Sequence, residues 1–242
     1  MKVAAIQMVS STALDDNLRV ARELLEQAAQ GGAELAVLPE YFCLMGHRDT
    51  DKLALRETAG SGVIQQFLAD TARALQIWIV GGTLPMATDV PDRVRNTTLV
   101  FDPTGACVAR YDKIHLFRFS NGAEQYDEGR VIDAGDTPVR FDLQARSGQR
   151  WRVGLSVCYD LRFPELYRAH ARAGADLLLV PSAFTRTTGQ AHWEVLLRAR
   201  AVENLAYVLA PAQGGVHANG RHTMGHSMLV DPWGSILAQR DQ

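Results

Sequence analysis

Short apolar runs alternate with amphipathic helical patterns along most of this chain of 242 residues. An apolar run at 2–9 is followed by a pattern from Leu14 to Gly31 in which apolar residues recur every three or four positions. A second strand is predicted at 34–38, and a second amphipathic helix at 63–75. Such alternation favours helices packed on the outside of a β-sheet.

Hairpin patterns in the middle and at the end of the chain argue against a purely parallel sheet. Residues 94–101 and 107–111 flank the turn Asp-Pro-Thr-Gly, and residues 227–230 and 236–238 flank Asp-Pro-Trp-Gly. The remaining predicted strands lie at 77–82, 139–143, 151–157, 176–181 and 207–211, and the remaining predicted helices at 164–173 and 190–205. We therefore predict an α/β fold in which helices cover mixed sheets, with one domain spanning residues 1–242.

Composition and charge exclude several classes of partner. The net charge of −2 and the lack of a basic tail argue against binding to nucleic acid or to an anionic membrane surface. No apolar stretch has the length of about 18 residues that a membrane span needs. Three widely spaced cysteines form neither a disulfide framework nor paired metal-ligand spacing. We expect a soluble protein in a reducing compartment, the cytoplasm.

One cysteine lies where a predicted strand gives way to a turn. The apolar run at 153–157 precedes Cys158, and a helix-compatible segment starts at Pro164 with Glu165 in its first turn. Oriented backbone N–H groups at such a turn favour a thiolate and can later stabilise an oxyanion. A single cysteine is more often a small core residue, so its role as a nucleophile depends on its neighbours.

Two further reactive side chains occupy equivalent places, because Glu40 and Lys113 also follow or end predicted strands. Ligand sites gather at strand ends in open α/β sheets, so these residues can converge on Cys158. Glu40 can take the thiol proton and return it to a departing amine, while the Lys113 ammonium and the backbone N–H of Tyr159 stabilise the oxyanion. The set predicts acyl transfer through a thioester.

Three segments resemble the signature segments of the nitrilase superfamily of carbon–nitrogen hydrolases, in the same order. They are Leu38–Phe42 (LPEYF), Tyr111–Phe117 (YDKIHLF) and Cys158–Arg168 (CYDLRFPELYR). The resemblance implies a four-layer α-β-β-α sandwich with two mixed β-sheets. It also implies an enzyme that hydrolyses linear amides, and we expect no cofactor.

The same resemblance assigns roles to four residues. Glu40 is the general base, Lys113 the lysine on the oxyanion side and Cys158 the nucleophile. A second glutamate of the family orients the lysine and the substrate, and Glu128 matches its position best, with Glu124 a weaker match. Both lie in the connection 114–136, whose length is itself typical of a functional loop.

Other segments place the chain near one branch of the superfamily. Tyr159 after the nucleophile resembles the Nit branch of amidases, since the true nitrilases have a Trp-Glu pair there. The segments Pro181–Thr185, Ala191–Ala201 and Gly225–Gly234 look most like the deaminated-glutathione amidases. This likeness implies hydrolysis of deaminated glutathione to 2-oxoglutarate and Cys-Gly. The sister ω-amidases, which act on α-ketoglutaramate or succinamate, share the frame and provide the alternative.

Such substrates are anionic, so the pocket needs cations besides Lys113. Arg162 can pair with a carboxylate in bidentate fashion, or instead form an internal ion pair with Glu165 or another acid. Arg186 and Arg221 are expected at the solvated surface, although either can meet the glycine end of a dipeptide. By resemblance, the pocket is also lined by Phe184, Tyr41 and His192.

Other arrangements compete with this interpretation. A Cys–His pair of Cys158 with His115 or His192 is chemically possible, but it leaves Glu40 and Lys113 without roles. A scaffold protein that keeps the frame without activity is a further alternative, and the presence of every expected catalytic residue type argues against it.

A cluster of imidazoles suggests a metal site. Its members are His217, His222 and His226, two of them in the Gly- and His-rich loop 214–225. Their spacing matches no recognised zinc site, so we expect no metal.

The family usually dimerises through the helices after the nucleophile and after the next strand. Here these helices are predicted at about Pro164–Ala173 and Gln190–Leu205. The resemblance therefore implies a homodimer or a higher homo-oligomer.

Overall fold

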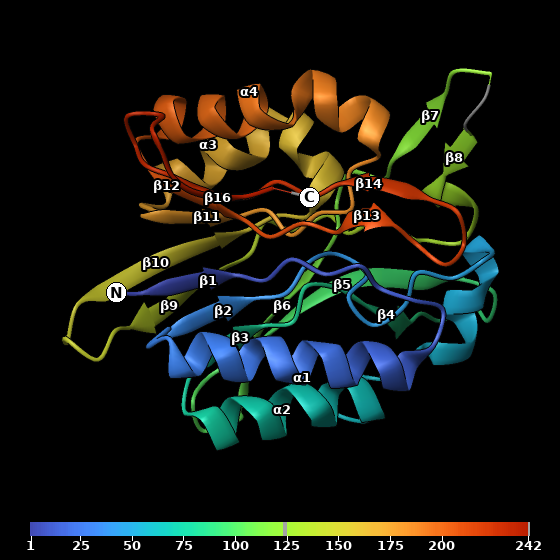
Figure 1. Ribbon diagram of the computed structural model, residues 1–242, viewed down its shortest axis with the longest axis horizontal. Coiled ribbons are helices and arrows are strands. Elements are labelled where there is room, and N and C mark those ends of the chain that lie inside the picture. Colours follow the sequence, from blue (N-terminus) through green and yellow to red (C-terminus); the bar gives the residue numbers. More distant parts are fainter. Residues whose placement is uncertain (123–124, 242) are drawn as a thin grey trace.

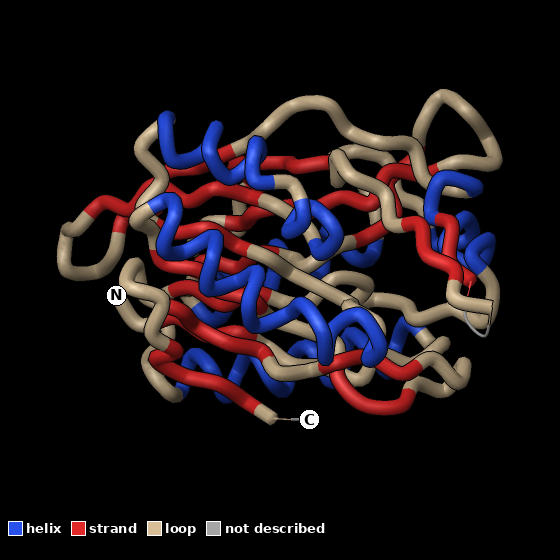
Figure 2. Tube along the Cα trace, turned by 90° about the horizontal axis from the view of Figure 1, so that it is seen from above, coloured by secondary structure: helices blue, strands red, loops and turns tan. Residues whose placement is uncertain are grey.

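The computed structural model describes residues 1–122 and 125–241. Two six-stranded sheets lie face to face, and two helices cover the outer face of each sheet (Figure 1). The predicted four-layer α-β-β-α sandwich with mixed sheets is therefore confirmed. Seen from above, the helices of one outer layer run across the strands beneath them (Figure 2).

The first sheet has the strand order β1-β2-β3-β5-β4, and β6 also pairs with β5. Its strands are β1 (Val3–Ala5), β2 (Leu35–Val37), β3 (Trp78–Val80), β4 (Leu84–Ala87), β5 (Val94–Phe101) and β6 (Cys107–Asp112). The pairs β1–β2 and β2–β3 are parallel and the others are antiparallel. Helices α1 (Leu14–Gln30) and α2 (Val63–Leu75) cover its outer face.

The second sheet has the strand order β16-β15-β12-β11-β10-β9. Its strands are β9 (Arg140–Gln144), β10 (Arg150–Leu155), β11 (Leu177–Leu179), β12 (Tyr207–Ala210), β15 (Ser227–Val230) and β16 (Ile236–Arg240). The pairs β10–β11 and β11–β12 are parallel, and antiparallel strands complete both edges. Helices α3 (Pro164–Arg172) and α4 (Arg186–Asn204) cover this sheet.

Strand β2 shows how both faces of a central strand are buried. Leu35 and Val37 pack in the hydrophobic cluster that joins the two sheets, whereas Ala36 packs in the cluster beneath α1 and α2. Successive side chains of a strand point to opposite faces, so a continuous apolar run suits this position. Leu18 and Leu25 of α1 complete the outer cluster from a single face of that helix.

Two connections that the sequence analysis treated as irregular contain hairpins. The segment 114–136 folds into β7 (Arg118–Ser120), β8 (Gln125–Asp127) and the 3₁₀ turn η2 (Glu128–Arg130), and the loop 214–225 contains β13 (Gly214–Val216) paired with β14 (His222–Met224). Strands of three residues are too short to show an alternating pattern, so these expectations were wrong. Edge strand β4 was missed because Pro85 interrupts it.

Helix α4 begins at Arg186, four residues before the predicted start. The side chain of Thr185 accepts a hydrogen bond from the backbone N–H of Thr188 at 3.2 Å and so caps the helix. Between β2 and α2 lies the 3₁₀ helix η1 (Asp49–Leu55). No helix in the part of the chain that the structure describes has the length and apolar character needed to cross a membrane.

Candidate active site

The structure brings Glu40, Lys113 and Cys158 together at strand ends. Glu40 follows β2, Lys113 directly follows β6 and Cys158 follows β10. The ammonium Nζ of Lys113 donates to Glu40 Oε1 at 2.8 Å, and the same carboxylate is close enough to the Cys158 thiol to add to the rise that burial causes in its pKa. The residues are 1%, 0% and 7% exposed, so they form a nearly water-free group between the sheets.

Both carboxylate oxygens of Glu40 are fixed by donors. Oε1 also accepts from Asn96 Nδ2 at 3.0 Å, and Oε2 accepts from the backbone N–H of Ala183 at 2.9 Å. Gly82 permits this arrangement, since a Cβ there would lie 2.0 Å from Pro39 O, beside Glu40. A buried carboxylate held in this way has little freedom to rotate, which is what a positioned proton carrier needs.

Glu128 binds the other side of the Lys113 ammonium. Its two oxygens lie 3.0 and 2.9 Å from Nζ, and they also accept from the Tyr41 hydroxyl at 2.6 Å and the Phe117 backbone N–H at 2.7 Å. Burial raises the pKa of Glu128, but the attraction of Lys113 and these hydrogen bonds outweigh it and lower the pKa below its usual value. Glu124, the weaker match, lies outside the described residues.

Lys113 is charged at neutral pH. Burial lowers the pKa of an ammonium, but here the charges of Glu128 and Glu40 dominate and raise the pKa of Lys113 well above its usual range. A fixed ammonium next to a thiol can stabilise both a thiolate and the oxyanion of a tetrahedral intermediate.

Cys158 has a left-handed backbone, with φ +49°, at the junction between strand and turn. Residues other than glycine adopt this region at a cost of about 1–3 kcal/mol, and such strain occurs where a side chain must be aimed. The backbone N–H of Cys158 donates to Pro181 O at 3.0 Å, so the turn is tied to the end of the neighbouring strand. Tyr159, the next residue, continues into the 3₁₀ turn η3 (Cys158–Arg162).

The pKa of the Cys158 thiol is shifted in the opposite direction to the one expected from the turn. Burial, followed by the negative charge of Glu40, raises the pKa of Cys158, and Lys113 offsets this only in part. The oriented N–H groups were expected to favour the thiolate, but two nearby carboxylates and the loss of water outweigh them. The raised pKa favours the thiol form of Cys158, and the Glu40 carboxylate is the acceptor placed to take its proton.

A clamp that the sequence analysis missed supports this turn. The Asp160 carboxylate accepts from the backbone N–H groups of Val157 and His115 at 2.8 and 2.9 Å, and from the Tyr111 hydroxyl at 2.7 Å. Tyr111 and His115 lie two residues before and after Lys113, so Asp160 joins the nucleophile turn to the lysine segment. Asp160 and Tyr111 both belong to the matched motifs, but nothing in their spacing reveals that they touch.

The two histidines considered as partners for Cys158 are engaged elsewhere. His115 Nδ1 donates to Asp160 Oδ1 at 2.7 Å, and its ring stacks on Phe163 with 3.6 Å between the centroids. His192 Nδ1 accepts from Arg162 Nη2 at 3.2 Å. Neither contact leaves an imidazole in the position of the base, which Glu40 already fills.

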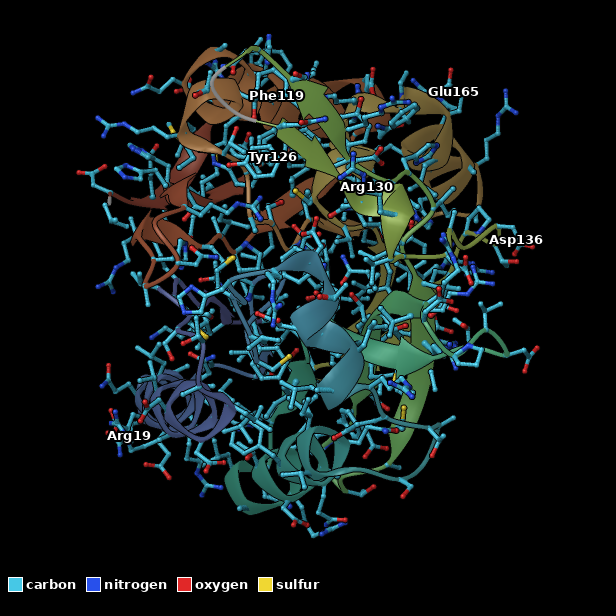
Figure 3. The ribbon with its side chains drawn as sticks, turned by 90° about the vertical axis from the view of Figure 1, so that its right-hand side faces the viewer. Arg19, Phe119, Tyr126, Arg130, Asp136 and Glu165 are labelled. Atoms are coloured by element: carbon cyan, nitrogen blue, oxygen red, sulfur yellow. The ribbon has the colours of Figure 1, made fainter. Side chains whose placement is uncertain are left out.

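A small cavity opens over the nucleophile, and Cys158, Arg162 and Phe184 line it. The Arg162 guanidinium lies over the Phe184 ring at 5.9 Å from its centroid. Glu165 points away from the molecule (Figure 3), and within residues 1–122 and 125–241 it forms no ion pair with Arg162. The internal pairing considered for Arg162 is therefore wrong, and its cation faces the cavity.

The other expected pocket residues are distributed over three places. Tyr41 lies on the far side of Glu128, in a neighbouring cleft, and His192 lines a groove beside α4. Arg186 is exposed at the start of α4. Arg221 is not the solvated surface residue that was expected, since its Nη2 donates to Ala183 O at 2.9 Å and its guanidinium lies over the Tyr126 ring.

Two of the candidate metal histidines, His217 and His226, bind protein groups. His217 is buried, and its ring nitrogens lie 2.8 Å from Ser10 O and 2.7 Å from Thr223 Oγ1. His226 Nδ1 accepts from Gln239 Nε2 at 2.8 Å. Among the described residues, no three His, Cys, Asp or Glu side chains are grouped to hold a metal ion.

Comparisons with known proteins identify the family. The carbon-nitrogen hydrolase profile matches residues 2–242. The deaminated glutathione amidase of Synechocystis is 44% identical over 97% of this chain and 85% of that protein. The crystal structure of Saccharomyces cerevisiae Nit3, from branch 10 of the nitrilase superfamily, has a TM-score of 0.86 and 31% identity over 100% of this chain and 86% of its own.

In a third relative, the active-site cysteine has reacted with a small molecule. A Glu-to-Gln mutant of the amidase from Nesterenkonia sp. AN1 has a TM-score of 0.80 and 27% identity, covering 100% of this chain and 89% of its own. In that structure acrylamide has undergone Michael addition at the active-site cysteine. Together these matches confirm the resemblance to Nit amidases, and the chain belongs to the carbon-nitrogen hydrolase family.

Proposed function

We propose that this protein is an amidase that hydrolyses the γ-amide bond of deaminated glutathione and releases 2-oxoglutarate and Cys-Gly. The observation that carries the proposal is the Lys113 ammonium, held between Glu40 and Glu128 beside the Cys158 thiol. The Synechocystis relative, named a deaminated glutathione amidase, supports the choice of substrate.

In the proposed acylation step, Glu40 accepts the thiol proton as Cys158 Sγ attacks the amide carbonyl carbon. The carbonyl oxygen becomes an oxyanion, which the Lys113 ammonium and the Tyr159 backbone N–H stabilise. The C–N bond then breaks, and Glu40 passes its proton to the nitrogen of the departing Cys-Gly. The products of this step are an amine and a thioester at Cys158.

In the proposed deacylation step, Glu40 accepts a proton from water as the water oxygen attacks the thioester carbonyl. The C–S bond breaks, 2-oxoglutarate leaves, and Cys158 recovers a proton from Glu40. Because the pKa of the resting thiol is raised, no stable thiolate competes for the Lys113 ammonium between turnovers. Glu128 keeps Lys113 charged and in place throughout.

The acyl part of the substrate carries its own carboxylate, and Arg162 is placed to bind it. Its guanidinium faces the cavity over Cys158 without a carboxylate partner among the described residues. Phe184 and the Tyr159 ring supply apolar surface for the methylene groups of 2-oxoglutarate.

The test is to measure 2-oxoglutarate release from deaminated glutathione and from α-ketoglutaramate. We expect a higher kcat/KM for deaminated glutathione, and no turnover of either substrate by Cys158→Ala. A higher kcat/KM for α-ketoglutaramate would identify an ω-amidase instead. Undiminished turnover by Cys158→Ala would refute the thioester mechanism.

We also propose that the protein acts in the cytoplasm as a homodimer whose interface includes α3 and α4. All three cysteines, of which Cys43 and Cys158 are buried, are free thiols, as a reducing compartment requires. The outer face of α4 exposes Val195 and Val202, which are 61% and 49% exposed. Light scattering should give twice the mass of one chain, and the double change V195E and V202E should reduce that mass.

A further inference from the structure

A second and larger cleft lies next to the proposed active site. It measures about 520 Å³ and is lined by residues of η1, the β7–β8 hairpin and residues 219–221. Its volume falls in the usual range of small-molecule sites. Tyr41 lines this cleft and bonds Glu128 through its hydroxyl, so one wall of the cleft rests directly on the ion group around Lys113.

The cleft and the cavity over Cys158 share a thin boundary. Ala183 lines the cavity, and its carbonyl oxygen accepts from Arg221 Nη2, which belongs to the cleft. Phe117 of the cavity packs against Tyr126 of the cleft, with 5.7 Å between ring centroids. A carbonyl hydrogen bond and one ring contact thus separate the two compartments, and a substrate with one end in each would have to part them.

The protein neutralises two cations of the cleft, Lys52 and Arg221, only in part. The Lys52 side chain is 15% exposed, and its nearest carboxylate, Asp49, lies 4.0 Å away, at the limit of an ion pair. The Arg221 guanidinium contacts a carbonyl oxygen, the Met45 sulfur and an aromatic ring, while its buried Nε has no hydrogen-bond partner. Burial, opposed only in part by Asp49 and Glu128, lowers the pKa of Lys52, so its ammonium is also short of compensation.

Partly buried cations whose charge is compensated only in part are costly, and an anion bound between them reduces that cost. Deaminated glutathione has such an anion, because its leaving dipeptide ends in the glycine carboxylate. Arg162 and Arg221 approach the same segment, at Phe184 and Ala183 respectively. One cation is thus available for each end of a substrate with two terminal carboxylates. Such a substrate has the length of about three residues, which is about 10 Å when extended.

We propose that Lys52 and Arg221 form a subsite that binds the terminal carboxylate of the leaving dipeptide. The inference rests on the proposed function and extends it, since it assigns the leaving-group side of the substrate to this cleft. The subsite provides selectivity for an amide with a C-terminal carboxylate over a primary amide such as α-ketoglutaramate.

The experiment compares K52Q and R221Q with the unaltered enzyme on both substrates. For each variant, kcat/KM for deaminated glutathione should fall at least tenfold more than kcat/KM for α-ketoglutaramate. The matched control is R19Q, which removes an exposed cation of α1 outside the first sheet and should leave the ratio of the two values unchanged within twofold. Circular dichroism and a thermal melt establish that each variant is folded.

A third substrate separates charge recognition from a structural effect. Deaminated glutathione with its glycine carboxylate converted to an amide should be a poorer substrate for the unaltered enzyme, and K52Q and R221Q should not reduce its turnover further. An equal loss on all substrates would make the two residues structural supports of Tyr41 and Ala183, and no loss would refute the subsite. If the unaltered enzyme fails to hydrolyse deaminated glutathione, the proposed function is wrong. If it hydrolyses this substrate normally and K52Q and R221Q have no effect on kcat/KM, only the proposed subsite is wrong.

Discussion

Cys43 and Cys158 are both buried thiols that lie near Glu40, in sequence and in space respectively, yet their surroundings differ. Burial raises the pKa of Cys43 to about 12, and its sulfur donates to the Thr83 carbonyl at 3.7 Å. Burial also raises the pKa of Cys158, but there a carboxylate and an ammonium adjoin the sulfur. Burial alone therefore gives an inert thiol, and the reactivity of a buried thiol depends on the ions beside it.

Removing the Lys113 ammonium should have the largest effect, because it takes away the cation that distinguishes the surroundings of Cys158 from those of Cys43. We expect K113M to reduce kcat by at least ~10²-fold, since an oxyanion donor is lost. Breaking a buried ion pair also costs about 3–5 kcal/mol of unfolding free energy, because Glu40 and Glu128 are left uncompensated. Steady-state kinetics and urea denaturation measure the two effects, and a change confined to KM would contradict the assignment.

The cost of K113M should depend on pH with a defined sign. In the unaltered protein the pKa of Glu128 is lowered, so its contribution to stability is present at neutral pH and is lost as the pH falls through its folded value. Without Lys113, burial raises that pKa, and the uncompensated carboxylate destabilises the fold at neutral pH. The stability gap between variant and unaltered protein should therefore narrow towards pH 4, as urea midpoints at several pH values would show.

Replacing the Glu40 carboxylate should have opposite effects on kcat and on the reactivity of the Cys158 thiol. E40Q should reduce kcat by about 10²–10⁴-fold, because the proton carrier is lost. The same change removes a negative charge that raises the thiol pKa, so the midpoint of iodoacetamide alkylation at Cys158 should move to lower pH. Cys43 provides the internal control, since its alkylation should stay slow in the folded variant. An unchanged or higher midpoint for Cys158 would show that Glu40 does not interact with the thiol.

Weakening the clamp at Asp160 tests how far the turn itself contributes. D160N keeps the size of the side chain but removes its charge, so the hydrogen bonds from Val157, Tyr111 and His115 weaken. We expect a loss of about 1–3 kcal/mol in unfolding free energy and a lower kcat with little change in KM. A loss of stability with unchanged kcat would limit Asp160 to a structural role.

The smallest effect should come from the second buried thiol. C43A removes one sulfur from a packed position and should cost about 1 kcal/mol of unfolding free energy. Its kcat should stay within twofold of the unaltered enzyme, in contrast to the complete loss in C158A. A large fall in kcat for C43A would mean that the two thiols are not functionally distinct.

Sequence reasoning predicted the layers and the strand ends because both depend on local patterns. A pattern of a few residues predicts each of three elements: the apolar run of β2, the turn between β5 and β6, and the helical period of α1. Lys113 and Cys158 could be placed at strand ends for the same reason. Glu128 required the family resemblance, since nothing local distinguishes it from other acids in its loop.

The contacts that orient these residues could not be predicted in the same way. Asn96 and the backbone N–H of Ala183 fix Glu40 from positions 56 and 143 residues away along the chain. The short hairpins β7–β8 and β13–β14 depend on packing against distant segments, because three-residue strands have no pattern of their own. Arg221 was expected in solvent, and only the fold shows that it reaches Ala183.

The cap of α4 has a consequence for the whole molecule. Thr185, which starts this helix, directly follows Phe184, so the wall of the cavity and the first turn of a 19-residue helix are one rigid piece. A change in the backbone at Phe184 therefore also changes the position of the residue that caps the helix.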